Sequence, residues 1–166
     1  MQNLFKIQPY CLVLYLLLIG ISLGAVLASG AFSAPTIFRA ASLVPNLNIS
    51  LFQSGILMTS IFVKLNLLLN FLAFFILIYE ILALRVSGAK VAPTLGFISV
   101  ILIFLFTMYY TPYILEAQKL GEDGIANATF DAMHTQSVLV FKALMISLCL
   151  LFIVRLLKVS SGCKGR

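Results

Sequence analysis

Charged residues are scarce in this chain, and acidic residues are the scarcest. Asp and Glu together number only 5 among 166 residues, and charged residues of both signs make up 10% of the sequence. Hydrophobic residues make up 62%, and the mean hydropathy is +1.13. A soluble domain usually carries a surface of about 25–35% charged residues. This composition therefore excludes a soluble protein.

Residues that bind metals or form disulfides are also few. The three cysteines, Cys11, Cys149 and Cys163, show no metal-binding or redox spacing, so we expect free thiols and no disulfide framework. His134 is the only histidine, and one chain therefore cannot supply both axial ligands of a bis-histidine haem. The first apolar run lacks a cleavage site of the A-x-A kind, so we expect a retained anchor and no signal peptide.

Long apolar runs account for most of the chain. They are continuous rather than alternating, which is typical of membrane-spanning helices and not of barrel strands. A helix needs about 20 apolar residues to cross the bilayer core. We therefore predict an all-α protein, a single four-helix transmembrane bundle over residues 1–166. The runs are Cys11–Phe32, Ile56–Leu84, Leu95–Tyr110 and Val138–Leu157, and the spans are expected at about 11–32, 56–84, 95–116 and 135–157.

Basic residues are distributed unevenly between the two sides of a four-span protein. The side without the termini holds only Arg39 and Lys119. Lys and Arg concentrate on the cytoplasmic side of short loops, so the pattern predicts that both termini are cytoplasmic (N-in, C-in). The basic residues lie at separate loop ends, and we therefore expect a lipid bilayer and no nucleic acid as the partner. The side with the termini holds Lys6, Arg85, Lys90, Arg155, Lys158, Lys164 and Arg166.

The connection between the first two spans, residues 33–53, contains two prolines. We expect the first helix to break at Pro35, a short interfacial helix around Ile37–Leu43, and a new helix near Ser50. Gln53 would complete a capping box with Ser50, because the two residues have the required spacing.

Further local signals lie in the third and fourth helices. Pro112 should kink or loosen the third helix, because it lacks an amide hydrogen and its ring clashes with the preceding turn. Asp131 or Thr129 could cap the fourth helix. Glu80 stands apart from the other acidic residues, and we expect it to pair with Arg85 or to lie at the inner interface.

Small residues form a stripe on the first helix. Gly20 and Gly24 make a G-x-x-x-G motif, which Ala28 extends. Small residues allow helices to approach closely in lipid, where apolar burial supplies no driving force. We expect close packing within the bundle, and the alternative is a homo-oligomer or a partner subunit of a membrane complex that binds at Gly20 and Gly24.

Polar residues concentrate at the outer ends of the expected spans. Such residues are costly in a membrane and often functional, and unpaired ones should find each other. We therefore expect an outward-facing polar pocket, and the alternative is a hydrogen-bonded belt that ties the helix ends together. The candidate ligand-binding residues are Arg39, Gln53, Tyr110, His134 and Ser137, with Lys64 and Lys142 near the floor of the pocket.

His134 is the candidate metal ligand. Met58, Met108 and Met133 also lie toward the outer side, and thioethers together with imidazole suit Cu(I). The alternative is a hydrogen-bonded interface histidine. Ser137 lies three residues after His134, but nothing marks it as an activated nucleophile, so no catalytic residue is assigned.

Four segments at the span ends carry a family resemblance: Ser33–Arg39, Phe52–Gly55, Tyr109–Ile114 and Phe130–Ser137. They resemble a bacterial family of four-span proteins of unknown function, over nearly the whole chain. That family is similar to eukaryotic transmembrane protein two-oh-five and, more distantly, to the copper-resistance protein CopD and the haem-linked oxidase HemJ. The resemblance implies an inner-membrane four-helix bundle and, by analogy, metal or haem handling, with added weight on Arg39, Gln53, Tyr110, Pro112, His134 and Ser137.

Three functions of different classes are compatible with these patterns. The first is a small binding or transport-related protein whose outer pocket takes a metal ion or small ligand. The second is a haem-linked membrane oxidoreductase with haem or copper as its cofactor. The third is an accessory subunit that packs against a larger complex through the first helix.

Overall fold

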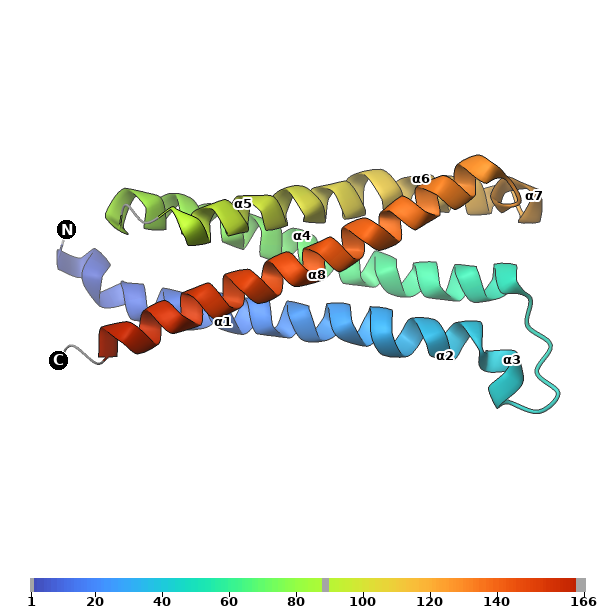
Figure 1. Cartoon of the computed structure of the whole chain (residues 1–166), viewed down its shortest axis with the longest axis horizontal. Coiled ribbons are helices and arrows are strands. Elements are labelled where there is room, and N and C mark those ends of the chain that lie inside the picture. Colours follow the sequence, from blue (N-terminus) through green and yellow to red (C-terminus); the bar gives the residue numbers. More distant parts are fainter. Residues whose placement is uncertain (1, 88–89, 164–166) are drawn as a thin grey trace.

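The computed structural model describes residues 2–87 and 90–163, and every element in these ranges is helical (Figure 1). The four predicted transmembrane helices are confirmed, because four stretches are long and apolar enough to span a membrane: Tyr10–Phe38, Leu51–Arg85, Val91–Lys119 and Ala128–Lys158. The elements in chain order are α1 (Gln2–Leu27), π-helical η1 (Ala28–Ser33), α2 (Ala34–Phe38), α3 (Ala40–Leu43), α4 (Leu51–Ser87), α5 (Val91–Phe104), π-helical η2 (Leu105–Tyr110), α6 (Thr111–Lys119), α7 (Glu122–Ile125) and α8 (Ala128–Cys163).

The long helices lie side by side, with both termini at one end and α3 and α7 at the other (Figure 1). We call the half with the termini the terminal half and the opposite half the distal half. α8 runs diagonally across the bundle and packs against α5 and α1, while α4 packs against α5 and α1. The centre of the bundle is formed by fully buried side chains from all four spans: Ile19, Leu69, Leu72, Ile76, Ile103, Leu144, Leu148 and Leu151.

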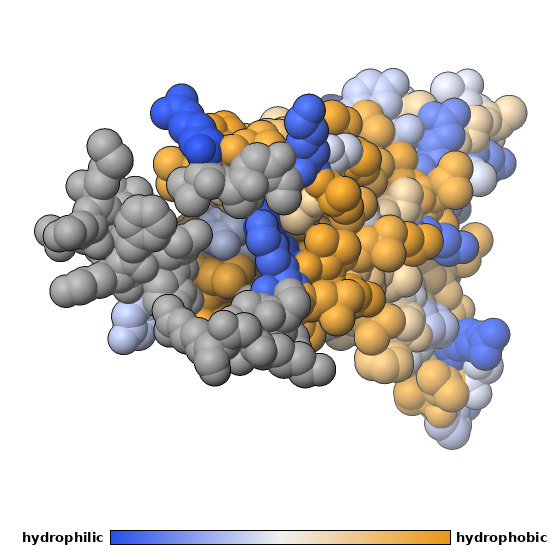
Figure 2. Space-filling model, turned by 60° about the vertical axis from the view of Figure 1, so that its left-hand side comes forward, coloured by the Kyte–Doolittle hydropathy of each residue, from blue (hydrophilic) through white to orange (hydrophobic). Residues whose placement is uncertain are grey.

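Apolar side chains also cover the outside of the bundle. Figure 2 shows them over most of one face, with hydrophilic side chains toward its two ends. Leu67, Ile101 and Leu139 are each more than 60% exposed. Such a surface matches the hydrocarbon core of a bilayer, where outward-facing apolar groups carry no penalty.

The first span does not break at Pro35, contrary to the sequence expectation. The helix continues through η1 and α2 to Phe38. In η1 the hydrogen bonds widen, so that the Ala34 amide donates to the Ser29 carbonyl, and Pro35 then falls in the first turn of α2. A proline is tolerated at such a position because no amide hydrogen is needed there. The predicted short helix beyond it is present as α3.

The expected loosening at Pro112 is confirmed by the same arrangement in the third span. The π-helical segment η2 precedes α6, and the Thr111 amide donates to the Phe106 carbonyl. Thr111 Oγ1 donates to the same carbonyl at 2.9 Å. The Thr111 hydroxyl thus supplies an additional hydrogen bond to a backbone carbonyl in the region where Pro112 disturbs the helix.

Two helix starts were assigned from the sequence, with different outcomes. The Ser50–Gln53 capping box is confirmed: the Gln53 amide donates to Ser50 Oγ at 3.1 Å, and the Ser50 amide donates to Gln53 Oε1 at 2.9 Å. The assignment of Asp131 or Thr129 as the cap of the last helix is wrong. α8 begins earlier, and Asn127 Oδ1 accepts the Phe130 amide at 2.9 Å.

The expected close packing at Gly24 is not found among the residues that the structure describes. A Cβ atom at Gly24 would meet nothing within 4 Å, and one at Gly20 would make an ordinary 3.8 Å contact with Phe152. The reason is the rotation of α1, which turns Tyr15, Ile19 and Val26 into the bundle and Gly24 away from it. Close approaches occur instead at Gly30 and Gly96.

Candidate functional site

A cavity of about 620 Å³ lies in the distal half of the bundle. Residues of α1, η1 and α2 form one wall, residues of α8 form the opposite wall, and α4, η2, α6 and α7 contribute the remainder. We call it the distal cavity. Most of its lining is apolar: Val26, Leu27, Gly30, Ala31, Ala34, Phe38, Leu51, Gly55, Met58, Phe62, Phe106, Ile114, Ile125, Phe130, Val138, Phe141 and Met145.

Three aromatic rings from different spans pack together in the lining of the distal cavity. The ring centroids of Phe62 and Phe141 are 5.2 Å apart, those of Phe106 and Phe141 are 5.0 Å apart, and those of Phe62 and Phe106 are 5.5 Å apart. A Cβ atom at Gly30 would lie only 2.9 Å from Phe141 Cε1. Glycine at this position therefore lets η1 approach the aromatic cluster of α4, η2 and α8.

Seven of the lining residues are polar, and several of them form hydrogen bonds within the protein. Gln118 Nε2 donates to Thr59 Oγ1 at 3.0 Å, and Thr59 Oγ1 donates to the Gly55 carbonyl at 2.9 Å. Ser137 Oγ donates to the His134 carbonyl at 2.7 Å. These hydroxyls stabilise helices and their contacts. The polar lining residues are Thr59, Thr111, Gln118, Asp131, His134, Ser137 and Lys142.

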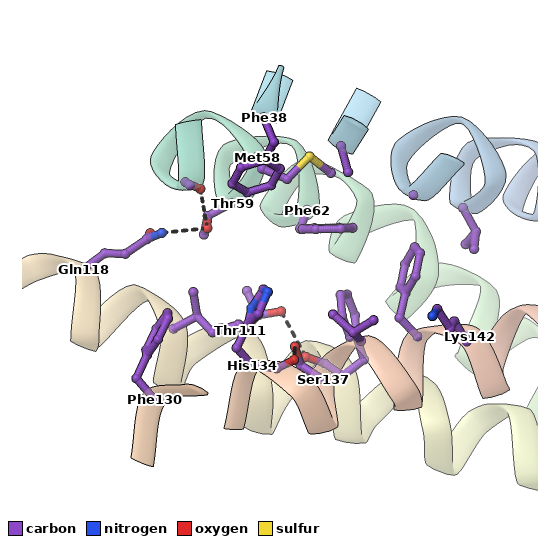
Figure 3. Close-up of a pocket in the computed structure, with 18 of the residues that line it drawn as sticks. Phe38, Met58, Thr59, Phe62, Thr111, Gln118, Phe130, His134, Ser137 and Lys142 are labelled. Carbon is purple, nitrogen blue, oxygen red and sulfur yellow. Dashed lines mark hydrogen bonds between the residues drawn. The ribbon is translucent and has the colours of Figure 1, made fainter. Parts of the chain in front are cut away.

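Two charged lining residues have no partner in the part of the chain that the structure describes. The side chains of Asp131 and Lys142 make neither a hydrogen bond nor an ion pair there. The His134 ring stacks on Phe130 with centroids 6.0 Å apart. Figure 3 shows Lys142 at one end of the cavity and Gln118 and Phe130 toward the other. The two ends of the cavity thus differ in the polar groups they present.

Three of the seven residues assigned from the sequence line the distal cavity. They are His134, Ser137 and Lys142, all on α8. Tyr110 is buried beside the cavity, where its hydroxyl donates to Gln136 Oε1 at 3.2 Å. Sequence spacing along one helix could not show which spans would lie opposite these groups.

The other three assigned residues lie outside the lining. Arg39 is exposed between α2 and α3, and Gln53 is exposed in the capping box of α4. Lys64 is exposed on the outward face of α4. Arg39 and Gln53 therefore lie at helix ends and do not meet His134 in the cavity. Lys64 is directed away from the cavity by the rotation of α4.

Residues suited to a metal ion do not gather in the described ranges. No group of three or more His, Cys, Asp or Glu side chains is found there that could hold a metal ion. Among the methionines considered with His134, Met58 lines the distal cavity, while Met108 is exposed.

A buried charged cluster in the terminal half escaped the sequence analysis. Glu80 does not pair with Arg85: its Oε1 atom accepts hydrogen bonds from the Tyr15 hydroxyl at 2.6 Å and from Arg155 Nε at 3.1 Å. Its Oε2 atom accepts a further bond from Arg155 Nη2. Glu80 is 0% exposed and Arg155 is 4% exposed. The guanidinium also lies 5.1 Å from the centre of the Tyr79 ring.

This cluster joins three spans directly and touches the fourth. Tyr15 belongs to α1, Glu80 to α4 and Arg155 to α8. On α5, a Cβ atom at Gly96 would lie 2.7 Å from Glu80 Cγ, so only glycine leaves room for the carboxylate. The one available signal was the isolated position of Glu80 among the acidic residues, since Arg155 looked like an ordinary flanking cation.

Comparison with known proteins identifies a family for this chain but finds no relative of known activity. No curated protein and no solved structure matches the chain. The model of a domain of unknown function, DUF4149, matches residues 17–123. The matched region contains most of α1 and continues past α6, and so includes every lining residue of the distal cavity except Ile125 and those of α8. The chain belongs to the DUF4149 family, a domain of unknown function.

Proposed function

We propose that this multi-pass membrane protein binds a small, mainly apolar ligand in the distal cavity. The observation that supports this proposal most directly is the cavity itself, with its volume of about 620 Å³ and its largely apolar walls. Ligand sites are typically clefts of roughly 300–1,000 Å³ that combine apolar walls with a few polar groups. In helix bundles such sites lie between facing helices.

The packing of the walls supports entry of the ligand from the bilayer. α2 packs against α4, whereas α8 packs against α1, α5 and η2. Lining residues of both walls are partly exposed: Leu27 is 45%, Phe38 is 42% and Val138 is 39% exposed. The cavity therefore reaches the apolar surface of the bundle, and an apolar ligand would pass from lipid to the site without crossing water.

The bias of basic residues supports an orientation for the site. With both termini cytoplasmic and the protein in the inner membrane, the distal half lies in the outer leaflet. The ligand would then be drawn from that leaflet.

Metal or haem chemistry and a partner subunit stay predictions. His134 as a metal ligand, or a haem-linked activity resembling that of CopD and HemJ, would be seen in elemental analysis and in absorbance near the Soret band. Association through Gly20 and Gly24 would be seen in the native mass of the purified protein.

The binding proposal is tested with a photoreactive long-chain alcohol that carries a diazirine in its alkyl chain. With the full chain in lipid nanodiscs, labelling of η1, α2 and the distal part of α8 should be saturable. Ala31 lines the cavity, and Ala28 in the same segment does not.

Ala31→Trp should therefore abolish the saturable labelling, because the indole fills the cavity, and Ala28→Trp should preserve it. Equal loss or equal retention in the two variants, with unchanged melting temperatures, would contradict the proposal.

A further inference from the structure

We propose that the ligand of the distal cavity is an anionic amphiphile whose carboxylate or phosphate group pairs with Lys142. This inference rests on the proposed function, because it names the chemical class of the ligand for the same site. Its motivation is a lysine that lines an apolar cavity deep in the membrane and has no partner among the residues that the structure describes.

The depth of Lys142 makes its charge significant. It lies 14 residues after Ala128 and 16 before Lys158, the bounds of the last span. At about 1.5 Å per residue these are distances of roughly 21 and 24 Å from the two ends of that span. Lys142 therefore lies near the middle of the hydrocarbon core, where ionised side chains are costly and usually pair or line a cavity.

The surroundings of Lys142 supply no counter-charge. The Lys119–Glu116 and Arg155–Glu80 ion pairs do not involve Lys142, which forms no ion pair within the part of the chain that the structure describes. The neighbouring cavity walls on its own helix are the apolar Phe141 and Met145. An anionic group on a ligand would satisfy the ammonium group, and the apolar remainder would contact the surrounding walls.

The other end of the cavity is unsuited to an anion. Asp131 lines it there, 11 residues before Lys142 and thus roughly 16 Å along α8. Its carboxylate repels a second negative charge. The two residues together orient the ligand, with the anionic group at Lys142 and an uncharged end toward Asp131.

Lys64 offers a matched control on a neighbouring helix. It lies 13 residues from the distal end of its span and is exposed, as Lys142 is, but it does not line the cavity. Any effect of a mid-membrane positive charge on the local concentration of anionic lipids should be similar for the two lysines. Only the lysine in the site should affect a cavity ligand directly.

The experiment uses three photoreactive probes with the same alkyl chain, which end in a carboxylate, a monophosphate or an alcohol. The full chain in neutral-lipid nanodiscs should bind at least one anionic probe about tenfold more tightly than the alcohol, as expected for a hydrogen bond to a charged group. The stronger of the two anionic probes identifies the head group.

Lys142→Met should remove the difference in affinity between the anionic probes and the alcohol, whereas Lys142→Arg and Lys64→Met should retain it. Equal affinities for all three probes in the unchanged protein would overturn the assignment of an anionic ligand. Equal loss of preference in Lys64→Met would overturn the role of Lys142. Neither result would affect the proposed apolar binding site itself, which is tested separately by saturable labelling with the alcohol and by the Ala31→Trp and Ala28→Trp variants.

Discussion

At the residue scale, Glu80 has both carboxylate oxygens occupied by partners on other helices. Removing a charge from water is costly, and attraction to a partner compensates only when the geometry is good and further hydrogen bonds are made. Here Arg155 approaches with two nitrogen atoms and Tyr15 adds a hydroxyl donor. The Tyr79 ring lies beside the guanidinium and adds a cation–π contact.

Removing one member of this ion pair should be far more harmful than removing both. Arg155→Met or Glu80→Met alone leaves a buried charge without its partner and should lower the free energy of unfolding by about 3–5 kcal/mol. The double variant should lose much less than the sum of the two. Denaturation of the purified protein in detergent measures all three variants. Additive losses would show that the two side chains do not interact.

Gly96 should tolerate substitution much less well than Gly24. In Gly96→Ala the new methyl group would lie 2.7 Å from Glu80 Cγ and 3.1 Å from Ile76 Cγ2. Overpacking of this kind costs about 1–3 kcal/mol. Gly24→Ala meets nothing within 4 Å and should keep or slightly raise stability, because alanine favours helices by about 1 kcal/mol. Melting temperatures of the two variants in the same detergent test this difference. A similar loss of stability in both variants would contradict the close packing at Gly96.

At the scale of elements, the two π-helical segments have a shared origin and a shared location. Each ends one residue before an X-Pro pair, Ala34-Pro35 in the first span and Thr111-Pro112 in the third. Both segments contribute to the distal cavity, through Gly30 and Ala31 of η1 and Phe106 of η2. π-Helical turns occur frequently at functional sites. Each of the two prolines therefore follows a π-helical segment that lines the same cavity.

The start of α8 should depend on Asn127 and not on Thr129. Asn127→Ala removes the side-chain oxygen that accepts the Phe130 amide, and loss of such a cap typically costs about 0.5–2 kcal/mol. Thr129→Ala should change stability little, since Thr129 is exposed within the first turn. Hydrogen exchange of the first turn of α8 provides the measurement. Faster exchange in Thr129→Ala than in Asn127→Ala would show that the helix begins later.

At the scale of the whole molecule, the two halves of the bundle differ in how they are held together. The terminal half contains the Tyr15–Glu80–Arg155 cluster, and Ser99 and Ser147 bridge α5 and α8 at 2.8 Å near its centre. The distal half contains the cavity and the two π-helical segments. Ligand sites and moving elements are expected in the less stable regions of a protein. The tightly bonded half would hold the spans in register while the distal half admits a ligand.

The orientation of the whole molecule is tested by labelling single cysteines in intact cells. In a variant whose three native cysteines are replaced by serine, Asp123→Cys should react with a membrane-impermeant maleimide. Lys90→Cys should react only after permeabilisation, because positive residues favour the cytoplasmic side. Both positions are exposed, so accessibility within the protein is matched. The reverse pattern would contradict the assignment of cytoplasmic termini.

Local patterns in the sequence were sufficient to predict the helices, the four spans, the capping box at Ser50 and the disturbance at Pro112. These features depend on hydrophobic length and on interactions over a few residues, and both are readable along the chain. The end of the first span was predicted too early, at about residue 32 instead of Phe38. A proline usually signals a break, whereas here the π-helical turn before it preserves the helix.

The sequence by itself thus determined that this is a membrane protein made of helices, because the length and the hydrophobicity of a segment are local properties. The tertiary structure decided which polar residues meet. Glu80 and Arg155 are 75 positions apart in the sequence, and helical spacing cannot reveal a pair that is formed between two different helices. The distal cavity likewise depends on how η1, α4 and α8 rotate against one another, which brings Lys142 to the cavity and leaves Lys64 outside it.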